Sequence, residues 1–207
     1  ARRLELDRSH SLVHLSGVLP LEALAPAQAR GASSGVFHPL QAFPPDAPAG
    51  RFAGIQVGID AGAPLDARLR ALAQQLGATP FSLHGVDRAA YHAAAVFASN
   101  YLVAVQAAAA AVWERAGLPA EAARTALLPL ARGALEAIAD HPLAGALTGP
   151  VQRGDVATVE RHLRALALDP ARADLYRALA RELLRLPLAL DAARRAELES
   201  LLDPAGE

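Results

Sequence analysis

Three polar residues lie inside the most apolar segment of the sequence, YHAAAVFASNYLVAVQAAAAAVW at residues 91–113. They are His92, Ser99 and Asn100. In a helix each residue turns by about 100°, so His92 and Ser99 would point to the same side and Asn100 would flank them. An imidazole exchanges protons near neutral pH, and a hydroxyl and an amide form hydrogen bonds. This spacing is typical of a pocket that binds a small polar molecule and moves a proton.

A packed interior would explain the same three residues without any chemistry, if each side chain bonded to neighbouring backbone. A polar group buried without a partner costs about 1–3 kcal/mol, so each must face a protein group, water or a ligand. The sequence leaves both interpretations open.

Two further candidate sites lie where short β-rich runs end. The run GVFHPLQAF places His38 and Gln41 after a strand, and VHLSG places Ser16 and Gly17 in the same way. Open α/β folds bind ligands at the carboxyl ends of strands, and glycine lets backbone approach a planar ligand closely. The alternatives are a strand–proline turn at His38 and an ordinary tight turn at Ser16.

A fourth candidate is the loop LTGPVQRGD, which contains Thr148 and Gly149. It is long and polar for a helical region, as are loops that fold back over a site. An ordinary connection between helices would look the same.

Several chemistries lack their sequence patterns. The seven histidines show no metal-binding spacing, cysteine is absent, and no G-x-S-x-G, Walker or G-x-G-x-x-G motif occurs. The net charge is −1, with arginines scattered among acids and no lysine. This pattern argues against nucleic acid as a partner.

The elements that must position these residues change in type along the chain. Strands are expected at 11–17, 33–38, 52–60 and 79–84, with helices at 18–31 and 63–78. After His84 only helices are expected, at 87–116, 119–139, 155–168, 170–186 and 191–202, with Asp155, Asp169 and Asp191 as N-caps. The fold class is therefore α/β followed by all-α, with a boundary near Gly85 between domains at 1–85 and 86–207.

The long helix is expected to be a core helix rather than a membrane span. Its most apolar part, residues 93–113, contains Ser99, Asn100 and Gln106, whereas a span needs about 20 apolar residues. The long helix and the following ARTALLPLARGALEAI offer more apolar surface than the shorter helices can cover, which predicts a homodimer through the helical domain. No leader peptide is visible, so a cytoplasmic location is expected.

Four segments together resemble a known family: VHLSG, GVFHPLQAF, YHAAAVFASNYL and LTGPVQRGDVATVERH. In this order and at these separations they resemble a bacterial oxidoreductase family that pairs a Rossmann-like domain with a C-terminal helical domain of unknown function, DUF2520. The resemblance covers nearly the whole chain, and its motifs are specific only as a set. More distantly, the layout is similar to pyrroline-5-carboxylate reductase, prephenate dehydrogenase and 6-phosphogluconate dehydrogenase-like enzymes.

The resemblance implies a partial Rossmann-like layer, a helical dimerisation domain and NADP or NAD as cofactor. Family members begin with a glycine-rich phosphate loop that this sequence lacks, so the cofactor site is expected to be incomplete, with Ser16 and Gly17 at its nicotinamide end. His38 or His92 would serve as acid or base, and Ser99, Asn100 and Thr148 would bind the substrate, with Gln41 and Gly149 beside them.

The resulting hypothesis is an NAD(P)-dependent reductase or dehydrogenase of a small oxo or imino acid-like substrate. A rival hypothesis is a non-catalytic dimeric module that binds a nucleotide or metabolite. A third is that the sequence represents part of a complete enzyme.

Overall fold

The computed structural model describes residues 5–48 and 50–203 of the chain. They form two compact units, Ala1–Ala104 and Val105–Glu207. All strands end before residue 85, as expected, but the first unit also includes the helical residues 88–104.

The first unit is built on a four-stranded sheet in the order β1-β2-β3-β4. A 3₁₀ helix and a single turn of α-helix follow β1, which is less helix than the leucine and alanine spacing predicts. The elements are β1 (Ser11–His14), η1 (Leu21–Leu24), α1 (Ala25–Gln28), β2 (Ser33–Pro39), β3 (Gln56–Ala61), α2 (Leu65–Gln75) and β4 (Thr79–Ser82).

The strands do not all run in one direction. β1 pairs with β2 and β3 with β4 in parallel, whereas β2 and β3 are antiparallel, with His38 opposite Gly58 and Val36 opposite Asp60. The edge of the sheet that holds the end of β2 therefore also holds the start of β3. His38 lies at the carboxyl end of its strand, as the sequence predicts.

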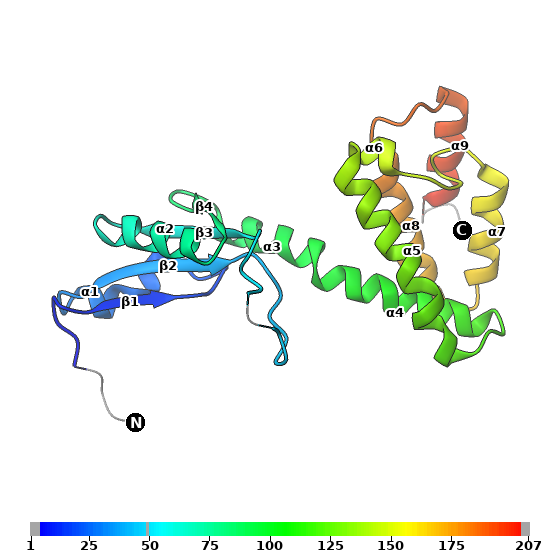
Figure 1. The fold of residues 1–207 in the computed structure, drawn as a ribbon. Coiled ribbons are helices and arrows are strands. Elements are labelled where there is room, and N and C mark those ends of the chain that lie inside the picture. Colours follow the sequence, from blue (N-terminus) through cyan, green and yellow to red (C-terminus); the bar gives the residue numbers. More distant parts are fainter. Residues whose placement is uncertain (1–4, 49, 204–207) are drawn as a thin grey trace. The chain divides into compact units, whose positions relative to one another are not determined.

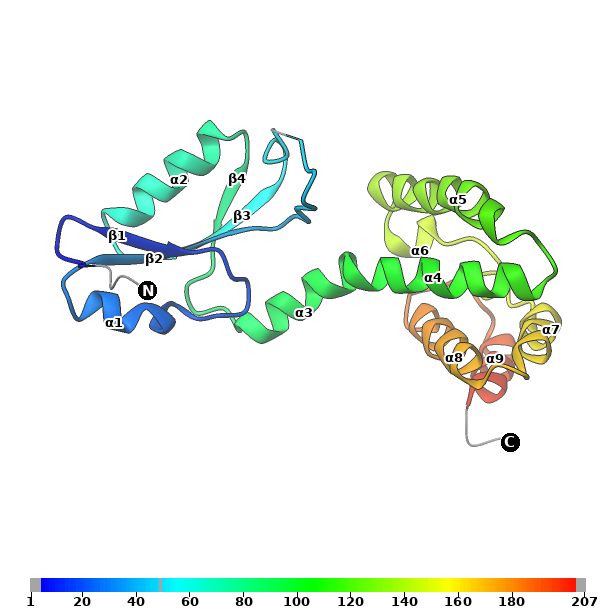
Figure 2. The same ribbon diagram turned by 90° about the horizontal axis from the view of Figure 1, so that it is seen from below.

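The two faces of the sheet are covered by different helices, with α2 over one face and α1 on the other (Figures 1 and 2). Side chains alternate along a strand, so Phe37 of β2 joins Val57 and Ile59 of β3 in the core against α2. Val36 and His38 therefore belong to the opposite face. Fold class and strand positions are as the sequence predicts.

The expected long helix consists of two segments, α3 (Arg88–Ala98) and α4 (Asn100–Arg115). They are separated at Ser99, whose φ and ψ of −123° and −69° leave the helical region and whose N–H is shared between the carbonyl oxygens of Ala95 and Val96. Serine and asparagine compete with helical backbone for hydrogen bonds, which explains a break at this position.

Up to residue 203, where the described residues end, the second unit contains five further helices. Short connections join them. α6 is a single helical turn in the stretch between α5 and α7, where the sequence predicts only a loop. They are α5 (Ala120–Asp140), α6 (Leu143–Ala146), α7 (Val156–Leu166), α8 (Pro170–Leu184) and α9 (Ala192–Leu202).

The core of this unit lies among the last three helices, which Figure 1 shows side by side. Val159 of α7, Leu184 of α8 and Leu198 of α9 belong to it and are at most 5% exposed. The three predicted N-caps are confirmed, because Asp155, Asp169 and Asp191 accept hydrogen bonds from the backbone at the third residue of each helix.

α4 and α5 take little part in that core. No residue of α4 is buried, and Ala123 is the one buried residue of α5. The segment Arg88–Arg115 is long and apolar enough to cross a membrane by length and composition alone, and none of its most apolar stretch is buried in the described chain. The expectation of a core helix is therefore wrong for a single chain, because too few neighbouring residues cover its alanine-rich surface.

Candidate active site

The turn after β1 brings backbone directly against two imidazole rings. A Cβ atom at Gly17 would lie 2.8 Å from Cε1 and Nε2 of His38 and 3.0 Å from Nδ1 of His92. Carbon atoms rarely approach other groups this closely without displacing them, so a side chain at residue 17 would push the rings away. Glycine is therefore favoured here by space, because any side chain would have to displace the two ring ends.

His38 and His92 come from different elements, β2 and α3. Their ring centroids are 6.4 Å apart and their planes are inclined by 68°. Both residues are partly exposed. The structure therefore brings together three predicted site residues, Gly17, His38 and His92, from distant parts of the sequence.

A phenol completes this cluster. The hydroxyl of Tyr91 lies 2.6 Å from Nδ1 of His38, and the two rings meet edge to face at 5.4 Å. Phe81 of β4 contacts the other side of the Tyr91 ring at a centroid distance of 6.1 Å. We call Gly17, His38, Tyr91 and His92 the imidazole–phenol cluster.

The first turns of α3 position half of this cluster. Asp87 caps the helix by accepting hydrogen bonds from the N–H groups of Ala89 and Ala90, at 2.9 and 3.1 Å. From this start, Arg88, Tyr91 and His92 have the i, i+3, i+4 spacing that places side chains on one helix face.

Arg88 is a buried charge next to the cluster. Its side chain is 8% exposed, and its Nη2 lies 3.5 Å from Oδ2 of Asp60 on β3. Within the described chain, neither terminal nitrogen of Arg88 makes a hydrogen bond. The carboxylate of Asp60 therefore offsets the charge of the guanidinium without a hydrogen bond to it.

Burial and these charges shift the proton equilibria of the cluster. Partial burial lowers the pKa of His38, and the positive charges of His92 and Arg88 lower it further. Burial raises the pKa of Tyr91, and Arg88 opposes that rise. At neutral pH the pair thus consists of a neutral imidazole and a neutral phenol, which can donate and accept protons beside Gly17.

The remaining candidates from the first unit lie on the surface. Ser16 adjoins Gly17, and its hydroxyl accepts a hydrogen bond from the N–H of Leu19. Ser99 and Asn100 are exposed at the junction of α3 and α4. Gln41 is exposed in the loop after β2, where its side-chain oxygen accepts from the N–H of Ala42.

Thr148 and Gly149 belong to the second unit, in the loop between α6 and α7. Thr148 is exposed, and Gly149 has a φ of +108°, a conformation that favours glycine. Their part in a common site with His92 stays a prediction.

Sequence reasoning missed Tyr91 and the charge pair of Arg88 and Asp60. The available signal was the spacing of Arg88, Tyr91 and His92 on one helix face. The contact of Tyr91 with His38 joins residues 53 positions apart, and no short-range sequence pattern indicates it.

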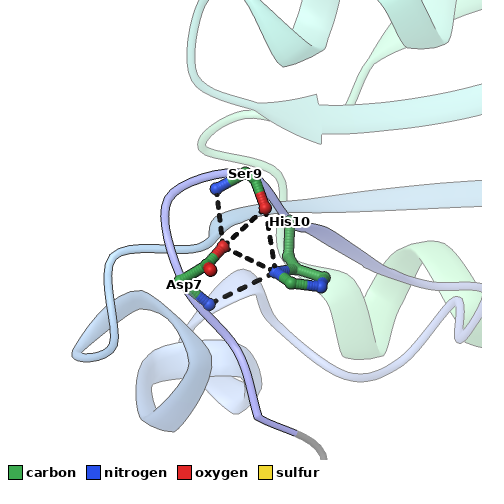
Figure 3. A network of polar contacts seen from close by, with 3 residues as sticks. All are labelled: Asp7, Ser9 and His10. Atoms are coloured by element: carbon green, nitrogen blue, oxygen red, sulfur yellow. Dashed lines mark hydrogen bonds and ion pairs between the residues drawn. The ribbon is translucent and has the colours of Figure 1, made fainter.

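A second polar cluster, formed by Asp7, Ser9 and His10, is a turn before β1 (Figure 3). Asp7 Oδ1 accepts from the hydroxyl of Ser9 at 2.6 Å and from its N–H at 2.8 Å, and it lies 2.8 Å from Nδ1 of His10. These contacts, the Ser9 hydroxyl first, lower the pKa of Asp7 to about 2. The Ser9 hydroxyl donates to the carboxylate at 2.6 Å, and its contact with Nδ1 of His10 is longer, at 3.3 Å, so the serine is not activated as a nucleophile.

A mixed four-stranded sheet with helices, followed by a helical region, is consistent with a Rossmann-like α/β fold joined to a helical domain. The chain belongs to the family described as a domain of unknown function (DUF2520), whose model matches residues 55–183. This range includes Tyr91 and His92 but neither Gly17 nor His38. No curated protein sequence matches the chain.

Two solved structures are similar to this chain. One is the proposed NADP oxidoreductase BF3122 of Bacteroides fragilis, with 30% sequence identity over 85% of this chain and a TM-score of 0.71. The other is protein TM1727 of Thermotoga maritima, with 26% identity over 84% of this chain and a TM-score of 0.67. The present chain spans 65% and 68% of these two proteins.

Proposed function

We propose that this chain forms part of an oxidoreductase that uses NADP or NAD to interconvert a small oxo or imino acid-like compound and its reduced form. The observation that carries the proposal is the imidazole–phenol cluster, which gathers proton-transferring groups around the buried backbone of Gly17. The similarity to BF3122 favours NADP as the cofactor. The more distant likeness to pyrroline-5-carboxylate reductase and prephenate dehydrogenase stays a prediction.

Ser16 and Gly17 follow β1, and the two imidazoles pack directly against the backbone of Gly17 because no side chain lies between them. A nicotinamide ring bound at this turn would lie close to both histidines. The bound cofactor would supply or accept a hydride. Ser16 and Gly17 would hold its nicotinamide end.

The chain's own residues would handle the proton that accompanies this hydride. His38 and His92 flank Gly17 and are both partly exposed, although Nδ1 of His92 is itself buried and makes no hydrogen bond within the described chain. One of the two rings would exchange a proton with a substrate oxygen or nitrogen placed there. Ser99, Asn100, Thr148, Gly149 and Gln41 are proposed to contact the substrate.

The proposal is tested with the complete gene product, NADPH or NADH, and a panel of small oxo and imino acids. We expect the absorbance of the reduced nicotinamide to fall when one class of substrate is added. The alanine variants of His38 and His92 should remain folded and convert that substrate at least tenfold more slowly. If nicotinamides bind without turnover of any compound, the non-catalytic module is correct instead. Equal turnover by wild type and both variants would remove the two histidines from the mechanism.

We also propose that the chain forms a homodimer through α4, α5 and α6. Its support is the exposure of large apolar side chains on these helices in the second unit, among them Val112, Leu130 and Leu143 at 37%, 73% and 57%. A cavity of about 580 Å³ also remains between α4, α5, α7 and α8. An apolar surface of this kind marks an interaction site in most proteins. A cytoplasmic location is part of the same proposal.

A further inference from the structure

We propose that Tyr91 is a positioning residue that holds His38 in one tautomer, with the proton on Nε2 and Nε2–H directed toward Gly17. The inference starts from three facts: the hydroxyl of Tyr91 is 2.6 Å from Nδ1 of His38, Nε2 is the nitrogen nearest to residue 17, and Tyr91 is held by packing. The importance of this tautomer for catalysis rests on the proposed function, whereas the existence of the tautomer does not depend on that function.

The direction of the hydrogen bond follows from the two groups. A neutral imidazole has one N–H and one nitrogen lone pair, and that lone pair accepts a hydrogen bond better than a phenol oxygen does. If Nδ1 of His38 carried the proton and donated instead, the better acceptor would be lost from this contact, and the hydroxyl hydrogen of the partly exposed Tyr91 would turn to water. Tyr91 therefore donates, Nδ1 accepts, and the proton of the neutral ring is on Nε2.

The surroundings of His38 keep its ring neutral. Its partial burial lowers its pKa most, and the charges of His92 and Arg88 on α3 lower it further. On β3, Asp60 faces Arg88 at 3.5 Å and offsets part of that charge. The hydroxyl of Tyr91 adds to this effect, because a donor to Nδ1 stabilises only the unprotonated ring.

A fixed Nε2–H gives His38 a defined role. It is a hydrogen-bond donor in the resting protein, so it can polarise a carbonyl or imine group placed beside Gly17 before any hydride arrives. A ring that exchanged tautomers would present a lone pair to the same group for part of the time and repel it. Tyr91 thereby acts on the substrate through His38, without touching it.

Nuclear magnetic resonance of the chain labelled with ¹⁵N at histidine measures the tautomer directly, since protonated and unprotonated ring nitrogens have well-separated shifts. The His38 signals are identified by their loss in His38→Gln. At neutral pH we expect Nε2 to be protonated and Nδ1 unprotonated. In Tyr91→Phe, the ratio of the two tautomers should fall by about fivefold, the factor that a hydrogen bond of ordinary strength supplies, and the pKa of His38 should rise.

The matched control is Tyr176→Phe. Tyr176 bonds to Nδ1 of His162 at 2.9 Å in the second unit, so its loss removes the same kind of contact and should leave His38 unchanged. A proton on Nδ1 of wild-type His38, or an unchanged tautomer ratio in folded Tyr91→Phe, would overturn the inference. Neither measurement needs a nicotinamide or turnover, so a failure of the proposed function is recognised separately by the activity assay.

Discussion

Single atoms decide how closely anything can approach the imidazole–phenol cluster, and residue 17 is where this is easiest to test. Gly17→Ala places a methyl group within 3.0 Å of both histidine rings. We expect the rings to move and the NMR chemical shifts of His38 and His92 to change. The free energy of unfolding should fall by only about 1 kcal/mol, because the displaced atoms are side-chain ends. Urea unfolding measures the loss of stability.

Gly62→Ala is the control for this change, because the added Cβ would meet no atom within 4 Å. Its stability should stay within about 0.5 kcal/mol of wild type. If both variants behaved alike, space at residue 17 would not be the constraint.

The proton equilibrium of His38 also has a measurable consequence for stability. Its pKa in the folded chain is lower than the usual 6.5, so the folded state binds the proton less well than the unfolded state. The stabilising contribution is complete above pH 6.5 and is lost as the pH falls through the folded-state pKa. Urea unfolding at a series of pH values should show a smaller acid-induced loss of stability in His38→Gln than in wild type.

Sequence alone could identify the types of residue in the site but only part of their grouping. The face shared by Arg88 and His92 is visible from helical spacing. The approach of Gly17, His38 and Tyr91 depends on the path of three separate elements, and short-range periodicity contains no information on that path. Ser99 and Asn100 illustrate the opposite error: they fit the helix pattern, yet the helix breaks there and both are exposed.

Among the elements, α9 offers a clear test of local stabilisation. Asp191 caps it by accepting from the N–H of Arg194 at 2.9 Å, and its Leu198 and Leu202 are fully buried in the core of the second unit. Asp191→Ala should lower the free energy of unfolding by about 1 kcal/mol. Asp191→Asn keeps a capping oxygen and should be close to wild type in the same urea titration.

Strand positions and caps could be predicted because they depend on neighbours in sequence. The direction of β3 could not, since an antiparallel and a parallel partner have similar patterns of apolar residues. The buried state of α4 was also predicted wrongly, because composition describes how apolar a helix is and not what lies against it.

At the scale of the whole molecule, the apolar surface of α4 to α6 is the main feature to explain. Leu130→Glu places a charge on this surface, at a side chain that is 73% exposed in the single chain. If a second copy covers it, the wild type should behave as a dimer at micromolar concentration and the variant as a monomer, because burying an unpaired carboxylate is strongly unfavourable. Light scattering measures both masses.

Leu168→Glu is the matched control, since Leu168 is 87% exposed but lies outside these helices, between α7 and α8. It should leave the mass unchanged. A wild type that is monomeric at the same concentration would contradict the homodimer directly.

The antiparallel pairing of β2 with β3 has a practical consequence for engineering. Pairing continues to the bond between the N–H of Leu40 and the carbonyl oxygen of Gln56, so the location of His38 is fixed before the chain enters residues 41–55. A reporter peptide inserted in that connection should therefore leave the ring of His38 where it is.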